Sequence, residues 1–256
     1  MQHITSKDNP NIKLYRKLAS GKKYRRETGL FVLEGIRLIS DAVKEKANLR
    51  SVFMTEGCAE KMQGESFASA DIFIIPDELA AYLSDTDSTQ GIFAVSGTPS
   101  KLPASDTIKN GGRYILLHSV QDPGNLGTII RTADAVGVDG VFLAECCDLY
   151  NPKVIRSTMG SIFRLNVSEV RFGDVFPLFK ERGVRTYAAV IDSDAVSLTD
   201  CDFSDGGAVL IGNEGNGLPK EISASCDVRL TIKMQGNVNS LNAAMAAGII
   251  MWELKK

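Results

Sequence analysis

The sequence has few of the side chains that bind metal ions. Its only histidines are His3 and His118, and none of its five cysteines forms a C-x-x-C pair. Zinc sites use clusters of cysteine and histidine, so the sequence predicts no bound metal. An odd number of irregularly spaced cysteines also argues against a disulfide framework and favours reduced thiols in a cytoplasmic protein. These cysteines are Cys58, Cys146, Cys147, Cys201 and Cys226.

Long apolar segments are absent as well. No run approaches the roughly 18 apolar residues needed to cross a bilayer, so we expect no membrane span. The first ten residues, MQHITSKDNP, lack the apolar core of a secretory signal, so we expect a cytoplasmic location. The sequence contains no G-x-x-x-x-G-K-[ST] or G-x-S-x-G motif, which excludes a standard P-loop and the nucleophile elbow of hydrolases.

Charge is unevenly distributed along the chain. Residues 1–30 hold eight basic and two acidic side chains, a net +6, so the remainder carries −8 of the total of −2. A basic segment on an acidic chain is a candidate contact for a polyanion, although a solvated helix face would have the same composition. Tyr15, Tyr24 and Phe31 lie among these charges and favour nucleic acid, because aromatic rings can stack on bases.

Composition and periodicity predict two α/β domains. The 256 residues are 44% apolar and 23% charged, as in ordinary globular proteins. In the first half, the expected strands are 30–35, 51–55, 72–75 and 91–95, and the expected helices are 11–19, 36–46 and 78–83. Prolines, glycines and small polar residues then mark a linker. We therefore place the domains at 1–98 and 113–256, with the linker at 99–112.

The second half predicts an open, mostly parallel sheet with helices on both faces. The expected strands are 114–117, 141–143, 186–190, 208–211 and 228–232, and the expected helices are 127–136, 152–160, 175–181, 219–224 and 240–254. The last helix is apolar nearly all round, so it should be covered on several sides. Ser240 is its expected N-cap.

Three polar, glycine-containing loops follow strands of this sheet, at 122–131, 211–219 and 235–242. Ligands of open α/β sheets bind outside the carboxyl ends of the strands, so the loops indicate a shared binding site. The glycines of the second loop, Gly212, Gly215 and Gly217, have the order G-x-x-G-x-G. This order and the late position of the loop exclude a dinucleotide fingerprint, G-x-G-x-x-G.

Two polar residues of the first loop suggest where the chemistry occurs. Asn125 is expected in the turn and Arg131 in the first or second turn of the following helix, so that both face one cleft. Arg131 is a charge among the apolar residues Ile129, Ile130, Ala133, Ala135 and Val136 of this helix. An exposed or salt-bridged arginine is the alternative interpretation.

Each of the three loops carries a motif. The motifs are Asn125-x-Gly127-x-x-x-Arg131, Ile211-Gly212-x-Glu214-x-x-Gly217 and Ser240-Leu241-Asn242-x-x-x-Ala246-x-Gly248. Their combination resembles the SpoU (TrmH) family of RNA ribose 2′-O-methyltransferases, in the SPOUT superfamily. The first half is similar to the substrate-binding domain of the rRNA-directed branch. That likeness rests on Ile4-x-Ser6-x-x-Asn9-x-x-Ile12-Lys13, on KKYR at 22–25 and on Phe31-x-x-Glu34-Gly35.

The resemblance implies a C-terminal SPOUT domain with a deep trefoil knot, preceded by a small α/β domain of a ribosomal-protein-like kind. Knots are rare exceptions among protein folds. The resemblance also implies a homodimer formed through the C-terminal domain, and S-adenosyl-L-methionine as the cofactor. The residues implied to bind this cofactor are Gly212, Gly217, Ile232, Met234 and Leu241.

The resemblance further implies roles for five catalytic and four RNA-binding residues. Arg131 would act on the ribose hydroxyl, and because a guanidinium stays protonated we expect it to stabilise alkoxide charge and bind a phosphate. Asn125 would orient Arg131 or the ribose, and Glu214 would hold the loops. Ser240 and Asn242 would cap the last helix and touch substrate. The implied RNA contacts are Lys22, Lys23, Arg25 and Arg26.

The resulting hypothesis is an enzyme that methylates a ribose 2′-hydroxyl, in 23S ribosomal RNA. A tRNA enzyme of the same class and a non-catalytic RNA-binding protein are the alternatives. The separate N-terminal domain favours ribosomal RNA, and the intact motif residues argue against a non-catalytic protein. Methyltransferases that confer resistance of the thiostrepton type resemble this architecture too, so such an enzyme is a further alternative.

Overall fold

The computed structural model describes residues 2–67 and 70–256, which form two compact units. The first unit contains the described residues up to Ser100 together with Asp148–Phe163, and the second contains Lys101–Cys147 and Arg164–Lys256. The sequence analysis placed residues 148–163 in the second domain, whereas in the structure they group with the first unit. The expected domain limits, 1–98 and 113–256, remain a prediction.

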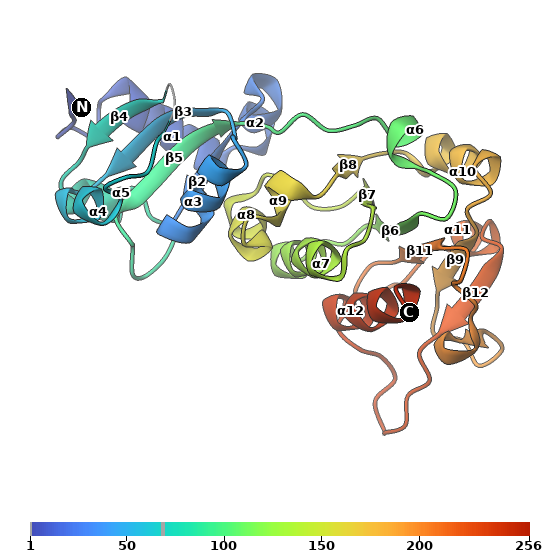
Figure 1. The fold of residues 1–256 in the computed structure, drawn as a ribbon. Coiled ribbons are helices and arrows are strands. Elements are labelled where there is room, and N and C mark those ends of the chain that lie inside the picture. The colour runs from blue at the N-terminus through green and yellow to red at the C-terminus, as the bar shows by residue number, and fades with distance from the viewer. Residues whose placement is uncertain (1, 68–69) are drawn as a thin grey trace. The chain divides into compact units, whose positions relative to one another are not determined.

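The first unit is built on a five-stranded sheet with the strand order β1-β4-β3-β5-β2 (Figure 1). β1, β4 and β3 are parallel, whereas β5 runs antiparallel to both β3 and β2. The strands are β1 (Gln2–His3), β2 (Leu30–Glu34), β3 (Leu49–Met54), β4 (Asp71–Ile74) and β5 (Ile92–Gly97). The helices are α1 (Pro10–Ser20), α2 (Lys22–Thr28), α3 (Ile36–Lys44), α4 (Glu56–Lys61) and α5 (Asp77–Leu83).

Helix α1 shows how the local sequence builds this unit. Asn9 caps it by accepting a hydrogen bond from the Asn11 N–H at 2.8 Å, and Pro10 occupies the first turn, where its missing N–H costs nothing. Ile12, Tyr15 and Leu18 follow at helical spacing and are buried. The ring of Tyr15 meets two aromatic rings of the sheet edge-on, so α1 is fixed with its charged side outward.

The segment Asp148–Phe163, which contains α8 (Pro152–Thr158), completes the core of the first unit. Phe31 of β2 is fully buried, and its ring lies 4.9 Å from that of Tyr150 and 6.3 Å from that of Phe163 between centroids. Arg156 donates to Glu34 at 3.2 Å. Because Phe31 packs on this segment, residues 1–98 would lack part of their hydrophobic core if separated from it.

Arg25 corrects one sequence prediction. Its side chain is only 4% exposed, and its Nε donates to Asp148 at 2.9 Å while Nη1 donates to the backbone carbonyls of Leu18 and Ala19. The guanidinium is therefore hydrogen-bonded within the protein and is not accessible to RNA phosphates. Lys22, Lys23 and Arg26, its neighbours in α2, are exposed.

The second unit confirms the predicted mostly parallel sheet. Its seven strands have the order β10-β12-β9-β11-β6-β7-β8, and all paired neighbours are parallel. The strands are β6 (Arg113–His118), β7 (Gly140–Ala144), β8 (Val167–Glu169), β9 (Thr186–Ala189), β10 (Val196–Ser197), β11 (Gly207–Ile211) and β12 (Val228–Thr231). The sequence missed β8 and β10, which are too short to show a periodic pattern.

Helices cover both faces of this sheet (Figure 1). α10 (Phe172–Glu181) packs on the face that Tyr114 and Leu116 present, together with α6 (Ala104–Thr107) and α11 (Lys220–Ala224). α7 (Pro123–Val136) and α12 (Ala243–Leu254) pack against each other and against β7 and β11, respectively. α9 (Ser161–Arg164) and a 3-10 turn (Leu198–Asp200) complete the helices among the described residues. The expected trefoil knot stays a prediction.

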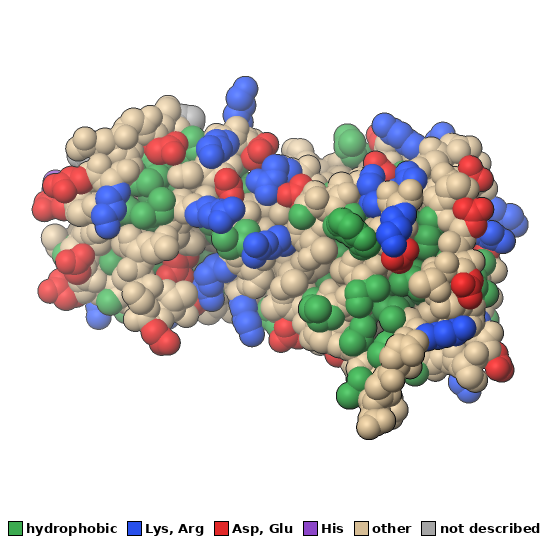
Figure 2. Space-filling model, turned by 60° about the horizontal axis from the view of Figure 1, so that its bottom comes forward, with side chains coloured by type: hydrophobic (Ala, Val, Ile, Leu, Met, Phe, Trp, Pro, Cys, Tyr) green, Lys and Arg blue, Asp and Glu red, His purple; other side chains and the backbone are tan. Residues whose placement is uncertain are grey.

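Helix α12 departs from the expectation in two ways. Asn242, not Ser240, is its N-cap, because the Asn242 side chain accepts hydrogen bonds from the Ala244 and Met245 N–H groups. The helix is also not covered all round within the chain: Met245 is 61% exposed, Ile249 40% and Trp252 64%. Figure 2 shows hydrophobic side chains gathered over this part of the second unit. Within the described residues, no helix has the length and apolar composition of a membrane span.

The Arg25–Asp148 pair should contribute measurably to the stability of the protein. Replacing Arg25 by Met would leave the Asp148 carboxylate, 14% exposed, without its cation, so the free energy of unfolding should fall by about 3–5 kcal/mol. Guanidinium denaturation followed by circular dichroism measures this change. Lys23→Met is the control: its pair with Glu27 is solvent-exposed, and its effect should stay within about 0.5 kcal/mol. Equal effects of the two substitutions would contradict the role of Arg25.

Candidate active site

Three loops leave the sheet of the second unit at the carboxyl ends of β6, β11 and β12. Because the strands are parallel, these ends lie at one edge of the sheet, the usual place for a ligand in an open α/β fold. The three loops are residues 119–122, 212–219 and 232–242. The geometry at this edge therefore decides whether they form one site.

The first loop is short because α7 begins earlier than the sequence suggested. Asp122 caps the helix by accepting a hydrogen bond from the Asn125 N–H at 2.7 Å, and Pro123 is the first helical residue. The aspartate–proline pair thus starts the helix four residues before the expected Gly127. Asn125 consequently lies in the first turn of α7 and not in the preceding loop.

Glu214 joins the second loop to the first. Its Oε2 accepts a hydrogen bond from the Gln121 N–H at 3.2 Å, and its Oε1 accepts from the Asp122 N–H and from Asn125 Nδ2, both at 3.1 Å. Desolvation tends to raise the pKa of this carboxyl, but the hydrogen bonds outweigh it and hold the pKa below its ordinary value. The carboxylate is therefore charged at neutral pH and binds the start of α7.

Asn125 joins the start of α7 to the third loop. Its Oδ1 accepts a hydrogen bond from Asn242 Nδ2 at 2.9 Å, while its Nδ2 donates to Glu214. Asn242 in turn uses its own oxygen to cap α12. Both amide groups are thus oriented by their partners, and one chain of hydrogen bonds connects Glu214, Asn125 and Asn242. The structure brings these three predicted site residues together.

Asn213 is an organiser of the second loop that the sequence analysis missed. Its Oδ1 accepts hydrogen bonds from the N–H groups of Gly215 and Asn216 at 2.9 and 3.1 Å, and its Nδ2 donates to the Ser119 carbonyl at 2.8 Å. Asparagine bonded to the backbone two residues ahead is a common turn signal, and it could have been recognised. Gln121, which donates to the Glu145 carbonyl at 2.8 Å, was missed as well.

The predicted cofactor-binding residues fall into two groups. Gly212 and Gly217 close the second loop on itself: a Cβ at Gly212 would lie 2.2 Å from the Gly217 carbonyl carbon, and Gly217 has a φ of +65°. Ile232, Met234 and Leu241 lie on the connection from β12 to α12, the first two half-buried and Leu241 37% exposed. Tight backbone and apolar side chains of this kind suit a ligand that is held by shape and backbone polar groups.

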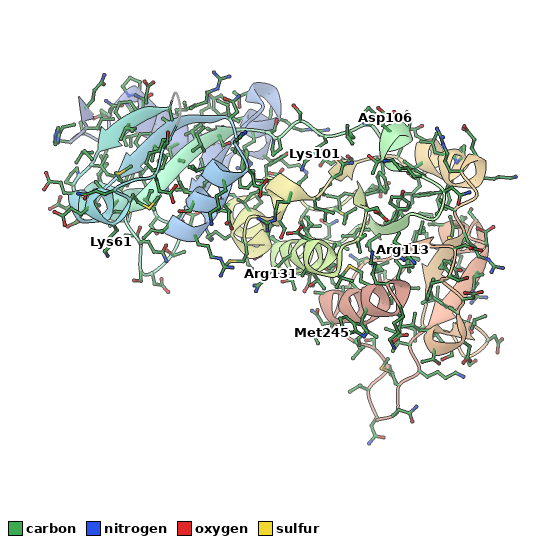
Figure 3. The ribbon with its side chains drawn as sticks, viewed as in Figure 1. Lys61, Lys101, Asp106, Arg113, Arg131 and Met245 are labelled. Carbon is green, nitrogen blue, oxygen red and sulfur yellow. The ribbon has the colours of Figure 1, made fainter. Side chains whose placement is uncertain are left out.

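Arg131 and Ser240 stand outside the hydrogen-bonded network. Arg131 is exposed on α7, six residues after Asn125, which corresponds to about 9 Å along the axis and about 120° around it (Figure 3). The two side chains therefore do not share a face of α7, and the expectation that both point into one cleft of this chain is corrected. Ser240 is exposed two residues before the cap of α12.

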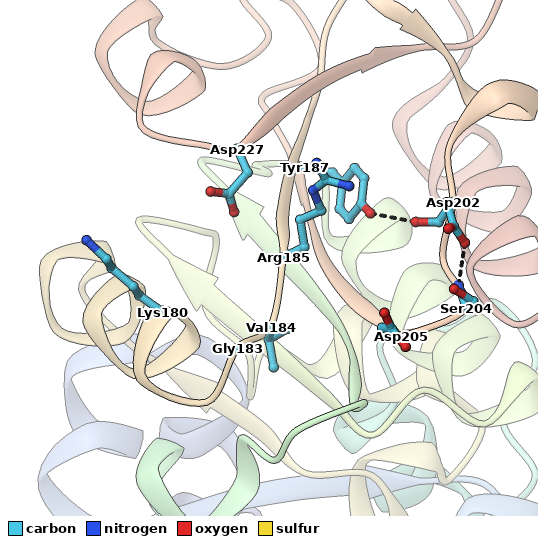
Figure 4. Close-up of a pocket in the computed structure, with 10 residues that line it drawn as sticks. Lys180, Gly183, Val184, Arg185, Tyr187, Asp202, Ser204, Asp205 and Asp227 are labelled. Carbon is cyan, nitrogen blue, oxygen red and sulfur yellow. Dashed lines mark hydrogen bonds between the residues drawn. The ribbon is translucent and has the colours of Figure 1, made fainter.

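A separate hollow lies at the opposite end of the strands. It has a volume of about 570 Å³ and is lined by residues that precede or begin β9, β11 and β12, among them Arg185, Asp205 and Asp227 (Figure 4). Because the hollow lies at the amino ends of the strands and the three loops lie at the carboxyl ends, the hollow is not part of the candidate active site. Over residues 2–67 and 70–256, no cluster of His, Cys, Asp and Glu side chains is suited to hold a metal ion.

Comparison with known proteins covers both units. The SpoU rRNA Methylase family matches residues 112–252, and the MRM3-like substrate binding domain matches residues 9–94. The chain is 29% identical, over the whole of both proteins, to the 23S rRNA (guanosine(2553)-2′-O)-methyltransferase RlmP of Bacillus subtilis.

The solved structures that resemble this chain are also methyltransferases. The chain is similar to the AdoMet-bound rRNA methyltransferase from Sinorhizobium meliloti, with a TM-score of 0.88, 31% identity and coverage of 99% of this chain and 97% of that one. It is also similar to the SpoU methyltransferase AviRb from Streptomyces viridochromogenes in complex with AdoMet. There the TM-score is 0.86 and the identity 27%, with coverage of 96% and 97%.

Removing the charge of Glu214 should disconnect the loops. In Glu214→Gln the amide nitrogen would face backbone N–H donors, so the affinity for S-adenosylmethionine should fall by about tenfold or more. Isothermal calorimetry at pH 7 measures this, with Glu221→Gln on α11 as the control that retains affinity. Because the pKa of Glu214 is depressed, wild-type binding should persist at pH 5 and be lost only below the ordinary pKa of 4.5. Unchanged affinity in Glu214→Gln would refute the role of this carboxylate.

Proposed function

The chain belongs to the SpoU rRNA methylase family, and we propose that its second unit transfers a methyl group from S-adenosyl-L-methionine to a ribose 2′-hydroxyl of 23S rRNA. The observation that carries this proposal is the network through Glu214, Asn125 and Asn242, which joins three loops at one edge of the sheet. The names of the relatives favour ribosomal RNA over tRNA, and the match of residues 9–94 to a substrate-binding domain agrees with a large RNA substrate.

The proposed division of labour follows from the loops. S-adenosylmethionine supplies a methyl group on a positively charged sulfur, so little covalent chemistry is left to the protein. Gly212 and Gly217 would bind this cofactor through their backbone, and Ile232, Met234 and Leu241 would contact it with apolar surface. Orientation of the ribose oxygen in line with the methyl group is then the main contribution of the protein to the rate.

Arg131 is the proposed catalytic residue at the ribose. Its guanidinium stays protonated at neutral pH, so it cannot serve as the base. The hydroxyl proton would pass to a phosphate oxygen or to water, and the cofactor would leave as the neutral thioether. We assign it the stabilisation of developing negative charge on the 2′-oxygen and a contact with the adjacent phosphate. Asn242 and Ser240 would touch substrate, and Asn125 and Glu214 would position the loops.

A homodimer is part of the proposal. Met245, Ile249 and Trp252 follow each other at helical spacing on α12, and their exposed apolar surface would be covered by the same surface of a second copy. α12 packs on α7, the helix that carries Arg131 (Figure 3). A second copy over α12 would thus be close to the proposed catalytic helix. We also propose a trefoil knot in the second unit and a cytoplasmic location.

Arg131→Ala should abolish methyl transfer without removing the cofactor. The expected loss in rate is about 100-fold or more, the usual consequence of removing one charge-stabilising group, while calorimetry should show S-adenosylmethionine affinity within twofold of wild type. Transfer of labelled methyl to 23S rRNA, followed by mapping of 2′-O-methyl positions, measures the rate and the site. Arg182→Ala, at the exposed C-cap position that ends α10, is the control. Near wild-type transfer by Arg131→Ala would remove this residue from the mechanism.

Charge placed on the apolar face of α12 should prevent dimer formation. Ile249→Glu and Trp252→Glu should each shift the protein from dimer to monomer, since either would bury an unpaired carboxylate in the interface. Size-exclusion chromatography with light scattering gives the mass, and Leu102→Glu, at another exposed apolar position, should leave the dimer intact. A wild-type protein that is monomeric at micromolar concentration would overturn the proposed dimer.

A further inference from the structure

Tyr82 on α5 is an exposed aromatic residue with two cations over its ring. The Lys7 Nζ lies 4.7 Å from the ring centroid and the Arg16 Cζ 5.0 Å from it, and the residue as a whole is 38% exposed. Within residues 2–67 and 70–256, neither cation has a carboxylate within ion-pair distance. A ligand with both a negative charge and an aromatic group could bind here, with its charge at the two cations and its aromatic group against the tyrosine ring.

The segment 7–27, which supplies both cations, carries an excess of positive charge. From residue 7 to residue 27, and leaving out the buried Arg25, seven cations face two carboxylates, a net +5. Asp8 and Glu27 are already paired with Lys13 and Lys23. Among the described residues, the cations of this segment without an ion pair are Lys7, Arg16, Lys17, Lys22 and Arg26. These five cations are therefore available to an anionic partner.

A second cation–aromatic pair involves the same helix, α1. The Lys17 Nζ lies 3.9 Å from the ring centroid of Tyr24 on α2. Lys17 and Arg16 are consecutive residues of α1, which packs against both α2 and α5. Rings next to cations offer stacking partners for bases and charge for phosphates, the combination by which proteins bind unpaired RNA.

We propose that Tyr82, flanked by Lys7 and Arg16, stacks on an unpaired base of the RNA substrate and adds base contact to phosphate contact on the first unit. This inference rests on the proposed function, and it names the form of RNA that the unit recognises. A duplex would satisfy the cations equally well but would leave the ring unused, because its bases are already stacked on each other. The surface is therefore suited to a loop or a single-stranded segment.

The test uses the full-length protein and two RNA probes, a single strand of about 12 nucleotides and the duplex of the same sequence. Fluorescence anisotropy gives the affinity for each. Tyr82→Ala should weaken single-strand binding at least fivefold, the lower limit for loss of one stacked base, and change duplex binding less than twofold. Tyr82→Phe, which keeps the ring, should bind like wild type. Leu102→Ala is the control for loss of an exposed apolar side chain.

Salt dependence separates the cations from the ring. Lys7→Met and Arg16→Met should weaken binding to both probes and lower the slope of log affinity against log salt by about 0.7 each for the single strand, whereas Tyr82→Ala should leave the slope unchanged. An effect of Tyr82→Ala below twofold, or an equal loss on both probes, would overturn the inference. Failure of the wild type to methylate 23S rRNA would instead refute the proposed function, and cofactor binding by calorimetry reports on that independently.

Discussion

The carboxylate of Glu214 is the interaction on which the candidate active site depends. Loops that follow separate strands have no covalent reason to adopt a common geometry, and each has polar backbone groups that water could satisfy instead. Glu214 accepts hydrogen bonds from two backbone N–H groups and one side-chain amide of the neighbouring loop. A charged acceptor binds such donors more tightly than a neutral one, so a single side chain fixes the start of α7.

Asn125 extends this constraint because an amide has both a donor and an acceptor. Its nitrogen is directed to Glu214, so its oxygen is left to accept from Asn242, whose own oxygen caps α12. The starts of two helices, α7 and α12, are thereby tied to one loop. Arg131 is exposed and free of this network, which separates the residues that hold the site from the residue proposed to do the chemistry.

The first unit depends on a long-range constraint of a different kind. Its core includes Phe31, which packs on rings from the segment Asp148–Phe163, and its most deeply buried cation, Arg25, is neutralised by Asp148. Even when the buried Arg25 is not counted, the exposed side chains of α1 and α2 include more cations than carboxylates. The surface available for a polyanion is therefore set by the side chains that remain without partners, and not by the count of basic residues.

The sequence by itself determined the alternation of strands and helices, the parallel sheet, the three polar loops and the family to which their motifs belong. These features follow from local periodicity and short spacings, which act within a few residues of the chain. Only the tertiary structure decided which of four neighbouring basic residues is buried and which residue caps α12. The physical reason is that a distant partner takes part in both outcomes: Arg25 meets a carboxylate 123 residues away, and Asn242 an amide 117 residues away.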